Sequence, residues 1–222
     1  MASFDAIVRF FQQGGLFMYP ILMVFAVGVA IALERYLYLT LARGANQRVW
    51  KKVLPSLNRG DFRQAEGIAA SSRTAIGRIL SYGLSRAHSA RRREDVEMAM
   101  EEGLMEVMPR LERRTPYLGT LANIATLLGL LGTIIGLIQA FTAVAQADPA
   151  QKADLLSASI SVAMNTTAFG LMVAIPMLLL HAMLQSKTGQ IVDSLEMASV
   201  RFLNLLGERE RPDVRRRMPE AA

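Results

Sequence analysis

Three long runs of apolar residues, at 16–39, 117–146 and 157–185, dominate the hydropathy pattern of the chain. A helix needs roughly 20 apolar residues to cross the hydrocarbon core of a bilayer, and each run is long enough. None shows the period-two alternation of a barrel strand, which is also shorter, at about 10 residues. The pattern therefore predicts an all-α membrane protein with three transmembrane helices.

The segment between the first two runs, residues 40–116, alternates helix signals with breakers. Pro55 and a turn at 58–61 interrupt its first part. Its last part, 94–114, is charged, and its apolar residues recur at spacings of three and four, as on one face of a helix: Val96, Met100, Leu104, Val107 and Leu111. We expect this helix to run on into the second span, kinked at Pro109 and Pro116.

The remaining segments are short. Residues 1–15 place apolar side chains at helical spacing before a Gly pair. This pattern predicts an amphipathic helix that lies on the outward-facing surface of the membrane. Residues 147–156 form a turn between the second and third spans, and 186–222 form a C-terminal helix and tail.

The distribution of Lys and Arg residues predicts how the chain is oriented across the membrane. Fifteen Lys and Arg residues lie between 41 and 116 and seven more from Lys187 onward, whereas 147–156 contains only Lys152. Because positive charges stay on the cytoplasmic side, we expect region 40–116 and the C-terminus on the cytoplasmic side of the membrane, and the N-terminus on the opposite side.

Composition excludes several chemistries. The chain has no cysteine, and its two histidines, His88 and His181, are far apart in sequence. Together with the lack of a nucleophile and base pair or a phosphate loop, this favours a protein that is not an enzyme and has no metal or cofactor. The basic runs near 91 and 215 lack interleaved aromatic residues, so they are typical of contacts with anionic lipids rather than nucleic acid.

Polar residues inside the second and third spans need an explanation. Thr126 and Thr133 lie seven residues apart on one helix face, flanked by Gly129, Gly132 and Gly136. If this face is considered by itself, close packing between helices is enough to explain it. The third span adds six Ser, Thr or Asn residues within 157–167, more than packing needs, and Gly170 and Pro176 follow. Such groups usually face a wet cavity or another subunit.

The motifs "GTIIGL" at 132–137 and "TTAFGLMVAIP" at 166–176, after "GGLFMYPILMVFAVGVAIALERYLYL" at 14–39, resemble the MotA/TolQ/ExbB proton channel family. Three spans favour its ExbB and TolQ branch. The resemblance implies a homo-oligomeric ring in the bacterial inner membrane, usually a pentamer, with the N-terminus in the periplasm. The ring would surround a single-span ExbD/TolR-like partner that carries a transmembrane aspartate, with protons as the coupled ion and a TonB- or TolA-like protein as a further partner.

By position, the resemblance assigns Thr133 and Thr167 to the proton pathway, with Thr166, Asn165 and Thr126 as further residues that face the pathway or the partner. Val162 departs from the family, since many relatives carry a glutamate five residues before the second threonine. The partner's acid would then be the titrating group in the membrane. Glu34, Arg35 and His181 could take part in function, although snorkelling and packing explain them as simply.

The sequence thus predicts the ring-forming subunit of a proton-driven motor that energises envelope transport. A non-conducting membrane scaffold that assembles cytoplasmic partners through region 40–116 is the alternative.

The topology can be tested with cysteines introduced singly into this cysteine-free chain. In intact spheroplasts, an impermeant maleimide should label Ala150→Cys and leave Ser85→Cys unlabelled, because only the 147–156 turn faces outward. The opposite labelling pattern would invert the topology.

Overall fold

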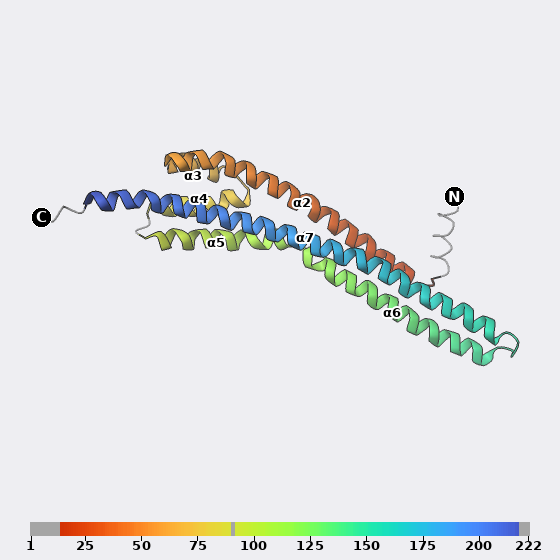
Figure 1. Ribbon diagram of the computed structural model, residues 1–222. Coiled ribbons are helices and arrows are strands. Elements are labelled where there is room, and N and C mark those ends of the chain that lie inside the picture. Colours follow the sequence, from red (N-terminus) through yellow and green to blue (C-terminus); the bar gives the residue numbers. More distant parts are fainter. Residues whose placement is uncertain (1–13, 90–91, 218–222) are drawn as a thin grey trace. The chain divides into compact units, whose positions relative to one another are not determined.

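The protein is described here by a computed structural model, which covers residues 14–89 and 92–217. These residues form helices and turns without a strand, in the order α2 (Met18–Arg59), α3 (Phe62–Ala70), α4 (Ala75–Ala87), α5 (Arg93–Glu112), α6 (Thr115–Gln146) and α7 (Lys152–Arg217) (Figure 1). Among them are three helices long and apolar enough to cross a membrane. The all-α fold with three candidate spans is therefore confirmed, whereas the predicted helix at 1–15 lies almost entirely outside the described residues.

The described chain divides into two compact units. The first contains α2 as far as Arg35, α6, and α7 as far as Leu184. The second contains the rest of α2 from Tyr36, then α3, α4 and α5, and α7 from Gln185 onward. We call them the membrane unit and the charged unit, because the first holds the three apolar runs and the second most of the charged residues.

The membrane unit is held together by small residues. Its core consists of side chains from all three helices, half of them alanine: Ile21, Ala122, Ala125, Val173, Ala174 and Met177. Gly28 of α2 lies against the side chain of Met177. Because lipid tails are as apolar as these side chains, the helices associate through close packing rather than through the hydrophobic effect.

The closest approach in this unit is between α6 and α7. A Cβ atom placed on Gly170 would lie 2.7 Å from the carbonyl oxygen of Ala125 and 3.1 Å from the Cα atom of Gly129. Gly132 and Gly136 face the same contact, against Thr166 and Ala163. The backbones of the two helices thus touch over about two turns, which only glycine allows.

Pro116 ends one helix and begins the next. The ring of Pro116 would collide with the carbonyl of Glu112, and it supplies no N–H group for that carbonyl. The helix accordingly stops at Glu112, Arg114 takes a left-handed conformation with φ of 66°, and α6 begins at Thr115 with the proline in its first turn. The expectation of one helix running through Pro116 is therefore wrong. Pro55 was expected to interrupt the helix, yet it lies inside α2, which ends at the predicted turn, where Gly60 has φ of 77°.

The charged unit has a conventional hydrophobic core. Its largest buried side chains include Leu57, Ile79, Leu84, Met100 and Phe202, and the ring of Phe202 packs edge-on against Phe62. Each short helix is capped: Asp61 accepts a hydrogen bond from the backbone N–H of Gln64, and Thr74 accepts one from Gly77.

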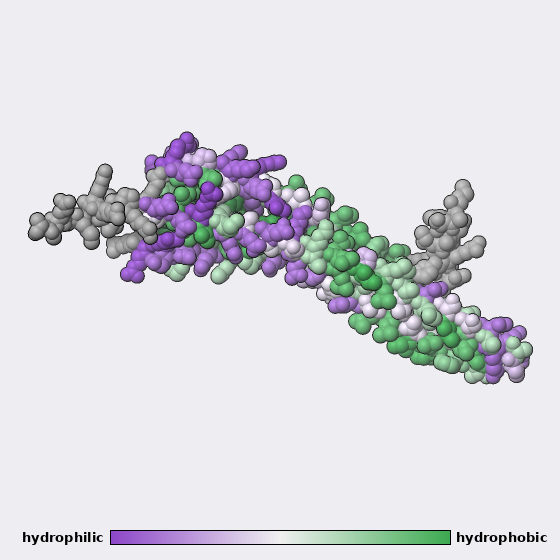
Figure 2. All heavy atoms as spheres, in the orientation of Figure 1, coloured by the Kyte–Doolittle hydropathy of each residue, from purple (hydrophilic) through white to green (hydrophobic). Residues whose placement is uncertain are grey.

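The surfaces of the two units differ in the way that their composition predicts. In Figure 2 hydrophobic residues cover the outside of the membrane unit, and hydrophilic residues cover the charged unit. Large side chains such as Leu127, Phe141 and Leu179 are more than 60% exposed. Exposure of this extent is typical of a surface that faces lipid.

The contact between α6 and α7 can be tested with two alanines in one helix. Gly170→Ala should reduce the free energy of unfolding in detergent by about 1–3 kcal/mol, because the methyl group would press on backbone atoms. Gly189→Ala, in the same helix with open space around it, should stabilise the protein by about 0.5–1 kcal/mol. Equal effects of the two substitutions would contradict the close packing.

Candidate functional site

One stripe along the outer surface of α6 is polar. Asn123, Thr126 and Thr133 follow each other at spacings of three and seven, next to the buried face of the helix. Asn123 and Thr126 are exposed, and Thr133 is half-buried. The neighbouring exposed positions carry Leu127, Ile134 and other large apolar side chains. The stripe thus places three polar side chains on one side of α6, beside exposed leucine and isoleucine side chains.

α7 adds Thr167 to the stripe. The hydroxyl of Thr167 donates a hydrogen bond to the carbonyl oxygen of Gly129, at 2.8 Å, and its oxygen lies 3.4 Å from the hydroxyl oxygen of Thr133. The structure thus brings together the two threonines that lie 34 residues apart in sequence. The glycine contact between the helices is what allows this distance.

Both hydroxyl groups of this pair donate their protons to hydrogen bonds within the protein. Thr133 donates to the carbonyl of Leu130 at 2.6 Å, as Thr167 does to Gly129. Thr126 likewise donates to Ala122 at 3.2 Å. Since a hydroxyl has one donor and two acceptor sites, the threonine oxygens remain available as acceptors. The pair is therefore suited to receive a hydrogen bond from a group that carries a proton.

Thr166 has different neighbours, although it precedes Thr167. Its side chain is 2% exposed, and its hydroxyl lies 2.6 Å from the carbonyl oxygen of Gly14, to which it donates. Val162, the position at which the resemblance to the family implies a glutamate, is half-buried and reaches within 3.3 Å of a Cβ atom placed on Gly15. Both residues lie against the segment that leads into α2, away from the threonine pair. Asn165 is half-buried.

The other residues singled out in the sequence lie elsewhere in the membrane unit. The ring of His181 is half-buried against Gly119 of α6. Pro176 is exposed within α7, which continues through it. Glu34 forms an ion pair with Arg114 at 2.6 Å, and Arg35 is buried. The pairing of Glu34 with Arg114 ties the end of the first span to the start of the second, and both side chains are nearly half exposed.

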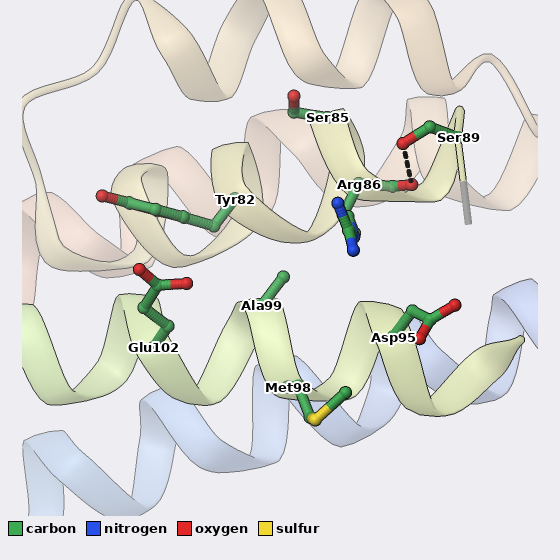
Figure 3. A pocket seen from close by; sticks show the side chains of 8 residues that line it. All are labelled: Tyr82, Ser85, Arg86, Ser89, Asp95, Met98, Ala99 and Glu102. Carbon is green, nitrogen blue, oxygen red and sulfur yellow. Dashed lines mark hydrogen bonds between the residues drawn. The ribbon is translucent and has the colours of Figure 1, made fainter.

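A second candidate is a polar hollow between α4 and α5 in the charged unit (Figure 3). Arg86 points from α4 toward α5, and Asp95 and Glu102 flank it from the other side. Nearby, Tyr82 donates a hydrogen bond to Glu106 at 3.0 Å, which raises the pKa of the Tyr82 phenol. Charges of both signs line this open hollow, so it favours no one class of small ligand.

Within residues 14–89 and 92–217, no group of three or more His, Asp or Glu residues could hold a metal ion. The threonine pair with its polar stripe is therefore the site on which a functional assignment rests.

Comparison with known proteins shows the family to which the chain belongs. The MotA/TolQ/ExbB proton channel family matches residues 71–197, more than half of the chain. The chain belongs to this family. It is 31% identical over 169 residues to the biopolymer transport protein exbB1 of Vibrio cholerae, covering 74% of this chain and 73% of that protein.

Two further proteins are similar to this chain, over different shares of their length. A protein of Methanothermobacter thermautotrophicus named as an ExbB homolog is 30% identical over 196 residues, which cover 87% of this chain and 68% of the relative. The Tol-Pal system protein TolQ of Haemophilus influenzae is 32% identical over 93 residues, 42% of this chain and 40% of TolQ. With three candidate spans, the chain is a multi-pass membrane protein of this family.

Sequence reasoning missed two features of the site. Asn123 lies three residues before Thr126 on the same face, and extending the stripe by one helical turn would have found it. The hydrogen bond from Thr166 to Gly14 carries no sequence signal, because 152 residues separate its two partners.

Proposed function

We propose that this protein is the ring-forming subunit of a proton-driven motor in a bacterial inner membrane, which works with a single-span partner resembling ExbD or TolR. The observation that carries the proposal is the polar stripe of Asn123, Thr126, Thr133 and Thr167 on the outside of a membrane-spanning unit. Polar side chains that face away from their own protomer at membrane depth are usually found beside water or another chain. A ring of copies around a partner helix supplies both.

The hydrogen bonds of the threonine pair suggest which protonation state of the partner's aspartate the site binds. Because Thr133 and Thr167 direct their protons to backbone carbonyls, their oxygens can accept a bond from a protonated carboxyl group. An ionised carboxylate needs donors, so it would gain nothing from the pair unless a hydroxyl left its carbonyl. The site therefore favours the partner's aspartate in its neutral form, and release of the proton weakens the contact.

This difference provides a way to couple proton entry to movement. Each proton that crosses the membrane potential releases about 2.3 kcal/mol per 100 mV. A change of a few kcal/mol in the contact between partner and ring is enough to shift the partner from one subunit to the next. We assign the driven load to envelope transport, in line with the names of the ExbB relatives.

The proposal needs an acid beside the threonines, which the apolar parts of α6 and α7 do not supply. α6 and the part of α7 between Leu155 and Leu184 contain no Asp or Glu. Val162 packs against the Gly15 segment and does not take the place of such an acid beside the threonines. A non-conducting scaffold, in contrast, would have no use for the stripe.

The role of the hydroxyl groups can be tested by nearly isosteric substitutions. Thr133→Val and Thr167→Val should each abolish partner-dependent proton flux in proteoliposomes while the oligomer still forms, because a membrane hydrogen bond contributes only about 0.6 kcal/mol on average. Thr142→Val is the matched control. Thr142 also donates to its own helix, at 2.8 Å from the carbonyl of Ile138, but lies on another face of α6, so flux should persist. Full flux in the Thr133 and Thr167 variants would assign these residues to packing alone.

The source of the acid gives a second test. Proteoliposomes that contain this chain alone should be nearly tight to protons, whereas co-reconstitution with its single-span partner should open a leak. Asn in place of that partner's membrane aspartate should close the leak again. Rapid proton flux without any partner would overturn the assignment, and a partner that binds without causing flux would favour the scaffold.

A further inference from the structure

Charges in the charged unit are segregated between two helices. From Ala42 to its end, α2 carries only positive charges, and its exposed residues Arg48, Lys51, Lys52 and Arg59 lie on one side around Pro55. We call this side the basic face. α5 presents Glu94, Glu97 and Glu101 with Met98 and Met105, which are 61% and 69% exposed. We call this side the acidic face.

Neither face is neutralised inside the protomer. Among the described residues the ion pairs are those of Arg78 with Glu106, His88 with Glu66 and Arg114 with Glu34. None of them involves a residue of the basic or the acidic face. Exposed methionines between the unpaired carboxylates add apolar surface, and this combination is typical of a protein interface.

The two faces lie at the same level along the helices. Leu111 of α5 lines one small groove together with Tyr38, Ala42 and Asn46 of α2, which places Leu111 level with Ala42. From that level, α2 is followed toward its C-terminal end and α5 toward its N-terminal end. At about 1.5 Å per residue, Lys52 and Glu101 each lie about 15 Å from it, and Arg59 and Glu94 each lie about 26 Å from it.

We propose that the basic face of one copy binds the acidic face of the next copy, an inference that rests on the ring of the proposed function. With the two helices antiparallel and level, Arg59 meets Glu94, Lys52 meets Glu101, and Pro55 meets Met98. Charged pairs then alternate with an apolar pair along one contact. Electrostatic attraction of this kind selects the register and suppresses other pairings.

The geometry favours a closed ring. In Figure 1 α5 lies along one edge of the charged unit, and the end of α2 with α3 lies along the opposite edge, with α4 and α7 between them. Two different faces on one unit give a head-to-tail contact, which closes only if successive copies are related by rotation without a rise. The equal levels of the two faces meet this condition.

A lipid surface fits the basic face less well. The expected end of the first span is Leu39, so Lys52 lies 13 residues farther along α2, which is about 20 Å at 1.5 Å per residue. Attraction to anionic headgroups falls off within about 8 Å at physiological salt. A lipid would also leave the acidic face without a partner.

Cysteine cross-linking tests the contact without changing a charge. The natural chain has no cysteine, so Pro55→Cys and Met98→Cys can be placed in separate copies that are co-expressed. Oxidation should give a disulfide-linked dimer from the mixture and none from either variant alone. With both cysteines in one chain, a ladder of multimers should appear. Met98→Cys co-expressed with Met197→Cys, which is 74% exposed on α7, is the control and should not form cross-links.

Charge reversal tests the pairing in the same cross-linking background. Lys52→Glu alone should reduce the yield of cross-linked dimer about fivefold, and Glu101→Lys should do the same, since each replaces an attraction between exposed charges by a repulsion. Placing both reversals together should restore the yield.

Three results would overturn the inference: cross-linking of either single variant with itself, equal cross-linking in the Met197 control, or no recovery in the double reversal. Proton flux, measured separately, distinguishes this failure from failure of the proposed function. Flux that persists without the contact would leave the motor assignment intact.

Discussion

Direct contact between the backbones of α6 and α7 is the constraint on which the membrane unit depends. Gly129 and Gly170 bring the two helices so close that the side chain of Thr167 reaches a carbonyl of the opposite helix at 2.8 Å. A larger residue at either position would separate the helices and remove this bond. The same approach brings Thr167 within reach of Thr133 and directs both hydroxyl protons to backbone oxygens. Packing and site chemistry therefore have one cause.

The segment before α2 is attached by the same part of α7. Thr166 donates to Gly14, and its methyl group lies against Gly132, so one threonine joins the entry of the first span to the contact between α6 and α7. Thr166 and Thr167 are adjacent in sequence but point about 100° apart on a helix, which gives them different partners. Thr166 holds the unit together, and Thr167 shapes the surface that faces outward.

The two units use different physics. In the membrane unit many large apolar residues lie outside and half of the core residues are alanine, because the surrounding lipid provides no reason to bury large side chains. In the charged unit large apolar residues such as Phe202 and Leu57 form the interior, and the charges lie outside. The segregation of these charges between α2 and α5 has no role in the fold of one protomer, since neither face pairs within the described chain.

The sequence by itself determined the all-helical class and the three candidate spans, because the apolar runs are long and contain almost no charged residues, and length and hydropathy are local properties. It also indicated Thr133 and Thr167, through motifs that resemble the family. It did not predict the break at Arg114, since whether Pro116 kinks a helix or begins a new one depends on the neighbouring helices. Only the tertiary structure decided that Thr166 contacts Gly14, that Val162 lies away from the threonine pair, and that Glu34 pairs with Arg114. These contacts join residues far apart in the chain, and the directions of their side chains follow from how the helices are rotated against each other, which helical periodicity alone leaves open.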